Sequence, residues 1–172
     1  MASHNDIQEC NFLVHLEDTR RFTLIDFDYA SFNFRGFDLA GYSNECQLDN
    51  NFEGGFPHVA YYEENAMTPA EETAMLQIYL EREWEIKLAR RAHAAEQDVS
   101  PLPPDPGALD SYLKANLGEL ATELKLMKTM AHLFWGVWAL ATVPVERREQ
   151  PLFNYHFSLT RLDGYNRTVA EL

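Results

Sequence analysis

Residues 4–28 of the chain read HNDIQECNFLVHLEDTRRFTLIDFD. This stretch contains two short apolar runs, Phe12–Leu16 and Phe22–Phe27, with a charged loop between them. Two such runs joined by a short polar loop predict a β-hairpin. Polar side chains stand at both of its ends, because His4–Asn11 leads into the first run and Asp26–Asp28 closes the second. The hairpin therefore brings two groups of chemically useful side chains toward each other.

The loop before the hairpin places Asp6 five residues ahead of Asn11. This is the His-x-Asp…Asn spacing of kinase catalytic loops. Phosphoryl transfer needs a carboxylate that accepts or orients the nucleophilic hydroxyl, and an oxygen ligand for the Mg²⁺ bound to the phosphates. Asp6 and Asn11 are candidates for these two roles. An Asp and an Asn also recur at this spacing by chance, so the interpretation depends on the second motif.

The second run ends at Asp26, where kinases carry the metal-binding Asp of their Asp-Phe-Gly motif. A tight hairpin returns Asp26 to the side of Asn11, and two oxygen ligands facing one site suit Mg²⁺. The alternative is that Asp26 only ends a strand and Asp28 only caps a turn. The order of both motifs around one hairpin favours the metal site.

The continuation of the second motif is more specific. Leu24–Ala40, LIDFDYASFNFRGFDLA, resembles the signature of choline/ethanolamine kinases. Further segments agree with that family in order, namely His132–Trp138, then Phe153–Tyr155 followed by Arg161–Tyr165. The resemblance covers nearly the whole chain and is faintest between residues 50 and 110.

The resemblance implies a mainly helical α+β fold, the C-terminal lobe of a protein-kinase-like enzyme, with a short catalytic β-hairpin followed by packed helices. It treats residues 1–172 as a single lobe, in which 1–40 carry the catalytic loop, metal hairpin and signature, and 109–172 the amine pocket. It also implies ATP-dependent phosphorylation of choline or ethanolamine, the first step toward phosphatidylcholine and phosphatidylethanolamine. Mg²⁺ is then the cofactor and ATP the co-substrate.

Carried over by position, the resemblance assigns catalytic and metal-binding roles to Asp6, Gln8, Asn11, Asp26 and Asp28. Asp6 is then the base, Gln8 stands beside it, and Asn11 and Asp26 hold Mg²⁺. Asp28 occupies a position where the family usually has Glu. His4 and Asp38 receive structural roles, Asp38 as the buried carboxylate that braces the catalytic loop.

The same resemblance assigns substrate binding to Glu45, Trp135, Trp138, Tyr155 and Phe157. A quaternary ammonium group cannot donate a hydrogen bond, so aromatic faces and a carboxylate hold it. Trp135 and Trp138 lie three residues apart, on one face of a predicted helix. A Trp pair in an apolar helix often only fills the core. The family context favours at least one Trp as part of an aromatic cage.

The chain departs from the family at several pocket positions. Gly41 replaces an Asn, Cys46 replaces an aromatic residue, and Phe157 stands where a cage Tyr is frequent. Asn50 lies near the expected place of another pocket Tyr. These departures predict a thinner cage and a reduced affinity for choline.

The rest of the sequence predicts helices. They cover Gly36–Cys46, a segment from Thr68 to about Ala94, Leu109–Thr142, and Phe153 to about Ala170. Thr68 supplies an N-cap before Pro69. The buried stripe of this second helix is expected at Leu76, Tyr79, Leu80 and Ile86. The Pro-rich stretch at 95–108 is expected to be a loop, and turn-forming residues break the chain at 50–57.

The composition limits the partners. A formal net charge of −13 disfavours nucleic acid and anionic membranes as ligands. Two cysteines are too few for a disulfide framework, which favours a reducing compartment, and no apolar run is long enough to span a membrane. We therefore expect a cytoplasmic protein without stable membrane insertion.

Only three residues precede His4, and no glycine-rich phosphate loop follows. We therefore expect residues 1–172 alone to have little or no kinase activity, since that loop positions the ATP phosphates. The surface that would face the missing lobe should be apolar and favour self-association, for instance as a homodimer. Two alternatives stay open at this point. One is a non-catalytic lobe that binds an intact kinase, and the other is a related phosphotransferase acting on an aminoglycoside-type alcohol.

Overall fold

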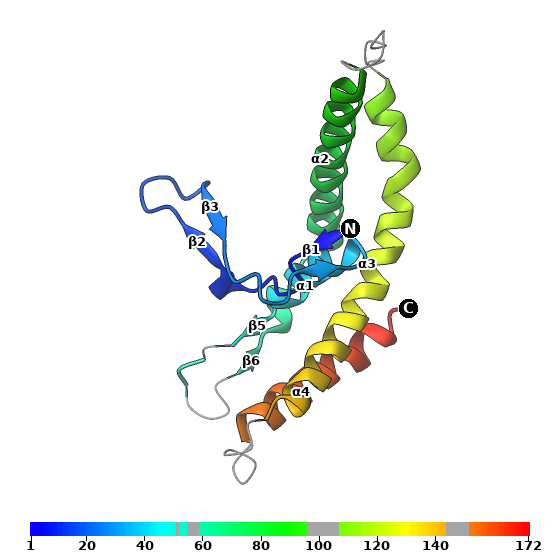
Figure 1. The fold of residues 1–172 in the computed structure, drawn as a ribbon. Coiled ribbons are helices and arrows are strands. Elements are labelled where there is room, and N and C mark those ends of the chain that lie inside the picture. The colour runs from blue at the N-terminus through cyan, green and yellow to red at the C-terminus, as the bar shows by residue number, and fades with distance from the viewer. Residues whose placement is uncertain (51, 55–58, 96–106, 144–151) are drawn as a thin grey trace. The chain divides into compact units, whose positions relative to one another are not determined.

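The computed structural model describes residues 1–50, 52–54, 59–95, 107–143 and 152–172. The described residues form two compact units (Figure 1). Unit 1 comprises residues 1–66 and 124–172, and unit 2 comprises residues 67–123. The predicted Pro-rich loop lies largely outside the described residues, since 96–106 are not among them. The single lobe expected over 1–172 stays a prediction.

The predicted β-hairpin is confirmed in unit 1. Strand β2, Phe12–Val14, pairs antiparallel with β3, Phe22–Leu24, so that Phe12 faces Leu24 across the ladder. The remaining strand pairs are also antiparallel: β1 (Ala2–Ser3) with β4 (Ser31–Phe32), and β5 (Leu48–Asp49) with β6 (Ala60–Tyr61). Short 3₁₀ turns cover Glu9–Asn11 and Glu63–Asn65. Each described sheet has only two strands, so each one joins two short segments of unit 1 and does not form a layer of its own.

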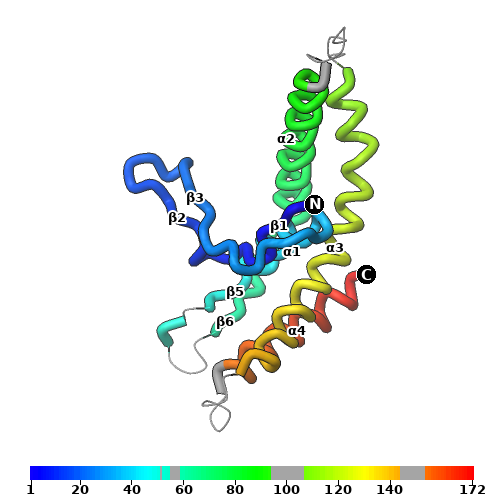
Figure 2. Tube along the Cα trace, viewed as in Figure 1, coloured from blue at the N-terminus to red at the C-terminus, as the bar shows by residue number. Residues whose placement is uncertain are grey.

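The expected helices are confirmed to within one or two residues. They are α1 (Gly36–Glu45), α2 (Pro69–Ala95), α3 (Ala108–Ala141) and α4 (Leu152–Val169). Within unit 1, α4 runs back alongside the C-terminal half of α3 (Figure 2). The side-chain amide of Asn154 donates to the carbonyl of Ala139 at 2.8 Å. Among the helices that the structure describes, none combines the length and apolarity needed to cross a bilayer.

The two helices approach closely where glycine permits it. A Cβ at Gly164 of α4 would lie 2.6 Å from the His132 ring of α3. Next to this contact, the core of unit 1 gathers around Trp135, with buried neighbours Leu48, Val59, Ala139 and Phe157. Tyr61 and Trp138 pack against it. This part of the core therefore combines the α3 and α4 segments predicted to carry the amine pocket with Leu48 and Val59 from the β5–β6 region.

In unit 2, helix α2 begins as the sequence predicts. Thr68 N donates to Glu71 Oε2 at 2.7 Å, and Glu71 N donates back to Thr68 Oγ1 at 3.3 Å, which is a reciprocal capping box. Leu76 and Leu80 are buried as expected, whereas the prediction for Ile86 is wrong, since it is 41% exposed. Ile86 follows Leu80 by six residues, and at 3.6 residues per turn this leaves it on another side of the helix. The inward face continues instead through Trp84, whose ring lies 5.0 Å from that of Tyr112.

Candidate active site

The loop that carries Asp6 is held by a carboxylate from α1. The backbone N–H groups of His4 and Asn5 donate to Asp38 Oδ2 and Oδ1 at 2.8 and 2.7 Å. Asp38 lies in the first turn of α1. Asn5 adopts a left-handed backbone, with φ of 67°. Two charge-assisted hydrogen bonds to adjacent amides fix this bend in the chain, which is the contact that the bracing role expected of Asp38 requires.

His4 joins the same loop to the second motif. Its buried ring lies 4.7 Å from that of Phe27, and its Nε2 lies 2.8 Å from the carbonyl oxygen of Ile25. The backbone N–H of Asp6 donates to Nδ1 at 3.3 Å. Since Nδ1 accepts, the ring hydrogen stands on Nε2 and is donated to Ile25. The segment that carries Asp26 is thus tied directly to the loop that carries Asp6.

Three predicted residues meet at Asp6. Asn11 Nδ2 donates to the backbone oxygen of Asp6 at 2.9 Å and to its Oδ2 at 3.0 Å. Gln8 Nε2 donates to the same Oδ2 at 3.3 Å. Because these amide groups are engaged as donors, Asn11 Oδ1 and Gln8 Oε1 are the atoms left for a ligand. Asp6 Oδ1 is likewise outside these bonds.

The hairpin also places Asp26 close to Asn11. The backbone N–H of Ile25 donates to the carbonyl of Asn11 at 3.0 Å, one residue before Asp26. Asp26 is exposed and has a φ of 62°. Asp28 is also exposed.

The atoms that could bind a metal ion at this end of the hairpin are all oxygens. They are Asn11 Oδ1 and the carboxylate of Asp26, and the carboxylate of Asp28 follows two residues later. Within the described ranges, no three His, Cys, Asp or Glu side chains cluster closely enough to form a metal cage of their own. Mg²⁺ is commonly held by one or two carboxylates together with water and substrate phosphates. The residues present therefore fit Mg²⁺ as shared ligands and do not form an all-protein metal site.

The two tryptophans predicted for the cage contact each other and a tyrosine that sequence reasoning missed. The ring centroids of Trp135 and Trp138 are 5.2 Å apart, and Tyr29 lies 5.4 Å from Trp135 and 6.2 Å from Trp138. All three pairs are edge-to-face or nearly so. Tyr29 directly follows Asp28, and this position in the signature segment is the feature of the sequence that could have indicated its place beside the tryptophans. The ring of Trp135 is mostly buried in the core of unit 1.

Glu45, the predicted pocket carboxylate, is paired with a buried arginine. Arg161 Nη2 of α4 donates to Glu45 Oε1, and the two side chains are only 4% and 10% exposed. Asn50 Nδ2 donates to the other oxygen, Oε2, at 2.9 Å. The Arg161 guanidinium also lies 4.9 Å from the ring centroid of Phe157. The guanidinium of Arg161 therefore already occupies the carboxylate of Glu45 and one face of the Phe157 ring.

Tyr155 is not brought to the other predicted pocket residues. It is 50% exposed, whereas Phe157 is buried. Residues two positions apart on an α-helix are separated by more than half a turn, so Tyr155 and Phe157 face different sides of α4.

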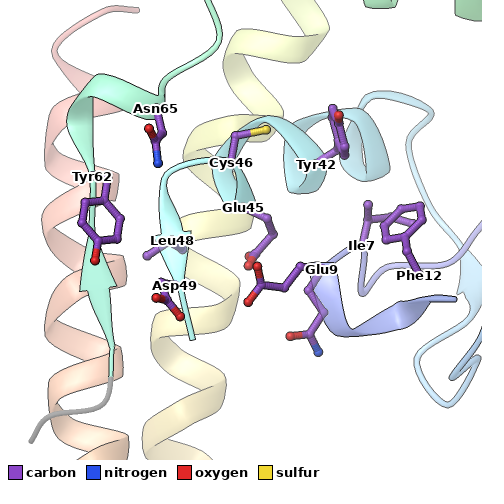
Figure 3. A pocket seen from close by; sticks show the side chains of 11 residues that line it. Ile7, Glu9, Phe12, Tyr42, Glu45, Cys46, Leu48, Asp49, Tyr62 and Asn65 are labelled. Carbon is purple, nitrogen blue, oxygen red and sulfur yellow. The ribbon is translucent and has the colours of Figure 1, made fainter. Parts of the chain in front are cut away.

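A cavity of about 350 Å³ opens beside the loop that carries Asp6, between that loop, the C-terminal end of α1 and the β5–β6 region (Figure 3). Its lining includes Gln8 and Glu9 from the loop, Glu45 from α1, and Asp49 and Tyr62. Gln8 links the cavity to Asp6, because the same side chain lines the cavity and donates to Asp6. A small molecule in this cavity would lie next to the proposed catalytic carboxylate.

Behind Arg161, the buried His132 is strongly perturbed. Burial, reinforced by the positive charges of Arg161, Arg167 and Lys128, lowers the pKa of His132 to about 3. Its Nδ1 has no hydrogen-bond partner among the described residues. His132 is therefore uncharged at neutral pH, which avoids a further positive charge beside the Arg161–Glu45 pair.

Known proteins resemble this chain along most of its length. The family model of choline/ethanolamine kinases matches residues 1–165. The choline/ethanolamine kinase of Mus musculus is 30% identical over 172 residues, which cover 98% of this chain and 38% of the mouse protein. The protein named "Probable choline kinase 3" of Arabidopsis thaliana is 29% identical over 154 residues, covering 88% of this chain and 36% of the plant protein.

A solved structure supports the fold. The crystal structure of choline kinase from Cryptosporidium parvum aligns with a TM-score of 0.63 at 21% identity, covering 99% of this chain and 38% of that chain. At this identity the likeness shows the fold alone, and it confirms the kinase-like α+β architecture. The chain spans little more than a third of the length of these relatives. The match of the family model over nearly all of the sequence shows that this chain belongs to the choline/ethanolamine kinase family.

Proposed function

We propose that the protein containing this chain transfers a phosphoryl group from ATP to the hydroxyl of choline or ethanolamine. The observation that carries the proposal is the hydrogen-bonded group of Asp6, Gln8 and Asn11 beside a cavity of about 350 Å³. The names of the related proteins supply the substrate class.

In this proposal, Asp6 orients the acceptor hydroxyl and takes its proton through the carboxylate. Asn11 and Gln8 hold one carboxylate oxygen, Oδ2, so that Oδ1 is the atom directed to the hydroxyl. Asp38 prevents the loop from moving while the proton is transferred, because it binds the amides just before Asp6. Asn11, Asp26 and Asp28 are the residues that would hold Mg²⁺. Bound there, Mg²⁺ neutralises charge on the ATP phosphates.

The amino-alcohol would enter the cavity with its hydroxyl toward Asp6 and its ammonium group away from it. Gln8 would lie between the cavity and Asp6, since it lines the cavity and donates to Asp6. The aromatic group of Tyr29, Trp135 and Trp138 offers ring faces on the α3 side of unit 1. The chain spans little more than a third of the length of its relatives, so the proposed activity is that of the whole protein that contains it. A cytoplasmic location remains an expectation.

The test uses the longest open reading frame that contains this sequence. The purified protein should phosphorylate choline or ethanolamine with ATP and Mg²⁺, measured by release of ADP. Asp6→Asn should lower kcat by about 10²-fold or more, since it removes the proton acceptor and keeps the shape. Asp110→Asn, an exposed position of unit 2, is the matched control and should leave kcat unchanged. Turnover of neither alcohol, or an unimpaired Asp6→Asn enzyme, would refute the proposal.

A further inference from the structure

The side chain of Asn5 makes a contact that a strand would make with its backbone. Strands β1 and β4 pair Ser3 with Ser31, and the same register carried two residues further places Asn5 opposite Tyr29. The backbone N–H of Asn5 does not complete this pair, because it donates to Asp38 Oδ1 at 2.7 Å. The side-chain amide donates instead, from Asn5 Nδ2 to the carbonyl oxygen of Tyr29 at 2.8 Å. Asn5 therefore links the two segments beyond the point where the ladder ends.

The other side-chain hydrogen bonds of Asn5 reach the same neighbouring segment. Its Nδ2 also donates to Ser31 Oγ at 2.8 Å, and its Oδ1 accepts a hydrogen bond from Asn33 Nδ2 at 2.8 Å. Asn5 is only 8% exposed, so water cannot easily replace these partners. Removing the side chain would leave buried donors and acceptors unpaired, which costs more than losing an exposed hydrogen bond. The three bonds together fix Asn5 against residues 29–33.

Asparagine is the residue that this position requires. The φ of Asn5 is 67°, a left-handed backbone that Gly, Asn and Asp adopt at low cost. Gly has no side chain and an ionised Asp has no donor, whereas the amide of Asn supplies two N–H groups and an acceptor oxygen. Of these three residue types, only Asn can therefore hold the bend and also bind the Tyr29 carbonyl, the Ser31 hydroxyl and the Asn33 amide.

The two segments that Asn5 joins carry different parts of the proposed site. Asp6 follows Asn5 directly in the chain. The ring of Tyr29 lies 5.4 Å from that of Trp135 and 6.2 Å from that of Trp138. A shift of the Tyr29 backbone would therefore move this ring against both tryptophans. Asn5 thus connects the carboxylate of the loop to the aromatic group of Tyr29, Trp135 and Trp138.

We propose that Asn5 is a positioning residue, which fixes the separation between the carboxylate of Asp6 and this aromatic group. The inference rests on the proposed function, in which Asp6 meets the hydroxyl of the amino-alcohol and the aromatic group offers ring faces to its ammonium group. In this role Asn5 touches neither the alcohol nor the transferred phosphoryl group. It acts through the two segments that it joins, so that both ends of one small alcohol are held at the same time.

The kinetic test measures how strictly the full-length protein selects the length of its alcohol. The preferred alcohol is compared with the homologue that has one more methylene between hydroxyl and nitrogen. Asn5→Gly keeps the left-handed backbone and removes the amide. It should lower kcat about tenfold and the ratio of kcat/KM for the shorter to the longer alcohol about threefold, because a fixed separation is lost. This ratio does not depend on the fraction of folded enzyme, so a loss of stability alone leaves it unchanged.

Two further variants complete the kinetic test. Asn5→Asp keeps the volume of the side chain without the amide donors, and it should reproduce both effects even if Asn5→Gly yields no folded protein. Asn166→Gly makes the same substitution at an exposed position of α4 and should leave the ratio unchanged. A ratio that both Asn5 variants leave unaltered, with or without a fall in kcat, overturns the inference. Absence of turnover with choline and ethanolamine in the unmodified protein refutes the proposed function instead.

A spectroscopic test decides the inference without turnover. The indole N–H signals of Trp135 and Trp138 report on the aromatic group, and Trp84 in unit 2 is the internal reference. In NMR spectra of the full-length protein, Asn5→Gly should shift the signals of Trp135 and Trp138 and leave that of Trp84 in place. Asn166→Gly should move none of the three. Signals of Trp135 and Trp138 that do not move in Asn5→Gly would overturn the inference, whatever the enzyme phosphorylates.

Discussion

The proposed catalytic loop and the proposed acceptor cavity lie next to each other in unit 1 and are held in different ways. Several short hydrogen bonds fix the loop, from Asp38 to two amides, from His4 to Ile25, and from Asn11 to Asp6. The wall of the cavity at Glu45 contains a buried charge pair with Arg161, which joins α1 to α4. Removing one partner of a buried ion pair leaves an uncompensated buried charge, which costs more than leaving a neutral amide without its acceptor. The loop should therefore tolerate single changes better than the cavity wall.

The largest expected effect comes from breaking the buried pair. Arg161→Met leaves the carboxylate of Glu45 buried without its cation, which should lower the free energy of unfolding by about 3–5 kcal/mol. The double variant Glu45→Gln with Arg161→Met removes both charges and should recover most of this loss. Chemical denaturation of the single and double variants measures the difference. Equal stability of the two variants would mean that the pair does not hold the wall.

A smaller effect is expected at the loop. Asp38→Ala leaves the N–H groups of His4 and Asn5 without acceptors, at a cost of about 1–3 kcal/mol, since each group is only partly buried. Asp38→Asn keeps one acceptor oxygen and should fall between the wild type and the alanine variant. The proposed activity should drop in the same order. If Asp38→Ala destabilised the protein more than Arg161→Met, the contrast between loop and wall would be reversed.

The smallest effect concerns pH and sharpens the same contrast. The pKa of His132 is lowered from its usual 6.5 to about 3. Between these values the unfolded chain binds a proton at this position and the folded chain does not. The associated stability is therefore fully present above about pH 6.5 and is lost as the pH falls, by at most ~1.4 kcal/mol per pH unit.

Denaturation at pH 7.5, 6 and 5 measures this slope. His132→Gln should flatten it, whereas His15→Gln, an exposed position in the hairpin, should not. Hydrogen exchange at pH 5 should show α3 and α4 opening before the catalytic loop, because His132 lies behind the cavity wall. Unchanged slopes in His132→Gln would show that another group controls the acid sensitivity.

The loop was predictable from the sequence and the cavity wall was not. The spacing of Asp6 and Asn11 together with the second motif at Asp26 indicated that the three meet at one end of a hairpin, because these contacts join residues close in the chain. Arg161 and Glu45 are separated by 116 positions, and no periodicity links them. An arginine in an acidic chain is typical of a solvated surface, so its burial could not be anticipated.

The aromatic group shows the same limit. The spacing of Trp135 and Trp138 indicated a shared helix face, and the structure places their rings in contact. Tyr29 joins them from a segment more than one hundred residues earlier, and only its position after Asp28 hinted at this. Ile86 was assigned to a buried stripe because it is apolar, although the helical period places it elsewhere.

The left-handed backbone at Asp26 restricts which residues can occupy that position. A φ of 62° is adopted at low cost by Gly, Asn and Asp, and at higher cost by other residues. Its proposed role as a ligand for Mg²⁺ would need an anionic or neutral oxygen donor, which excludes Gly and favours Asp over Asn. Aspartate is the residue that meets both the backbone requirement and the ligand requirement. Position 26 should therefore vary very little during evolution, even though its side chain is exposed to solvent.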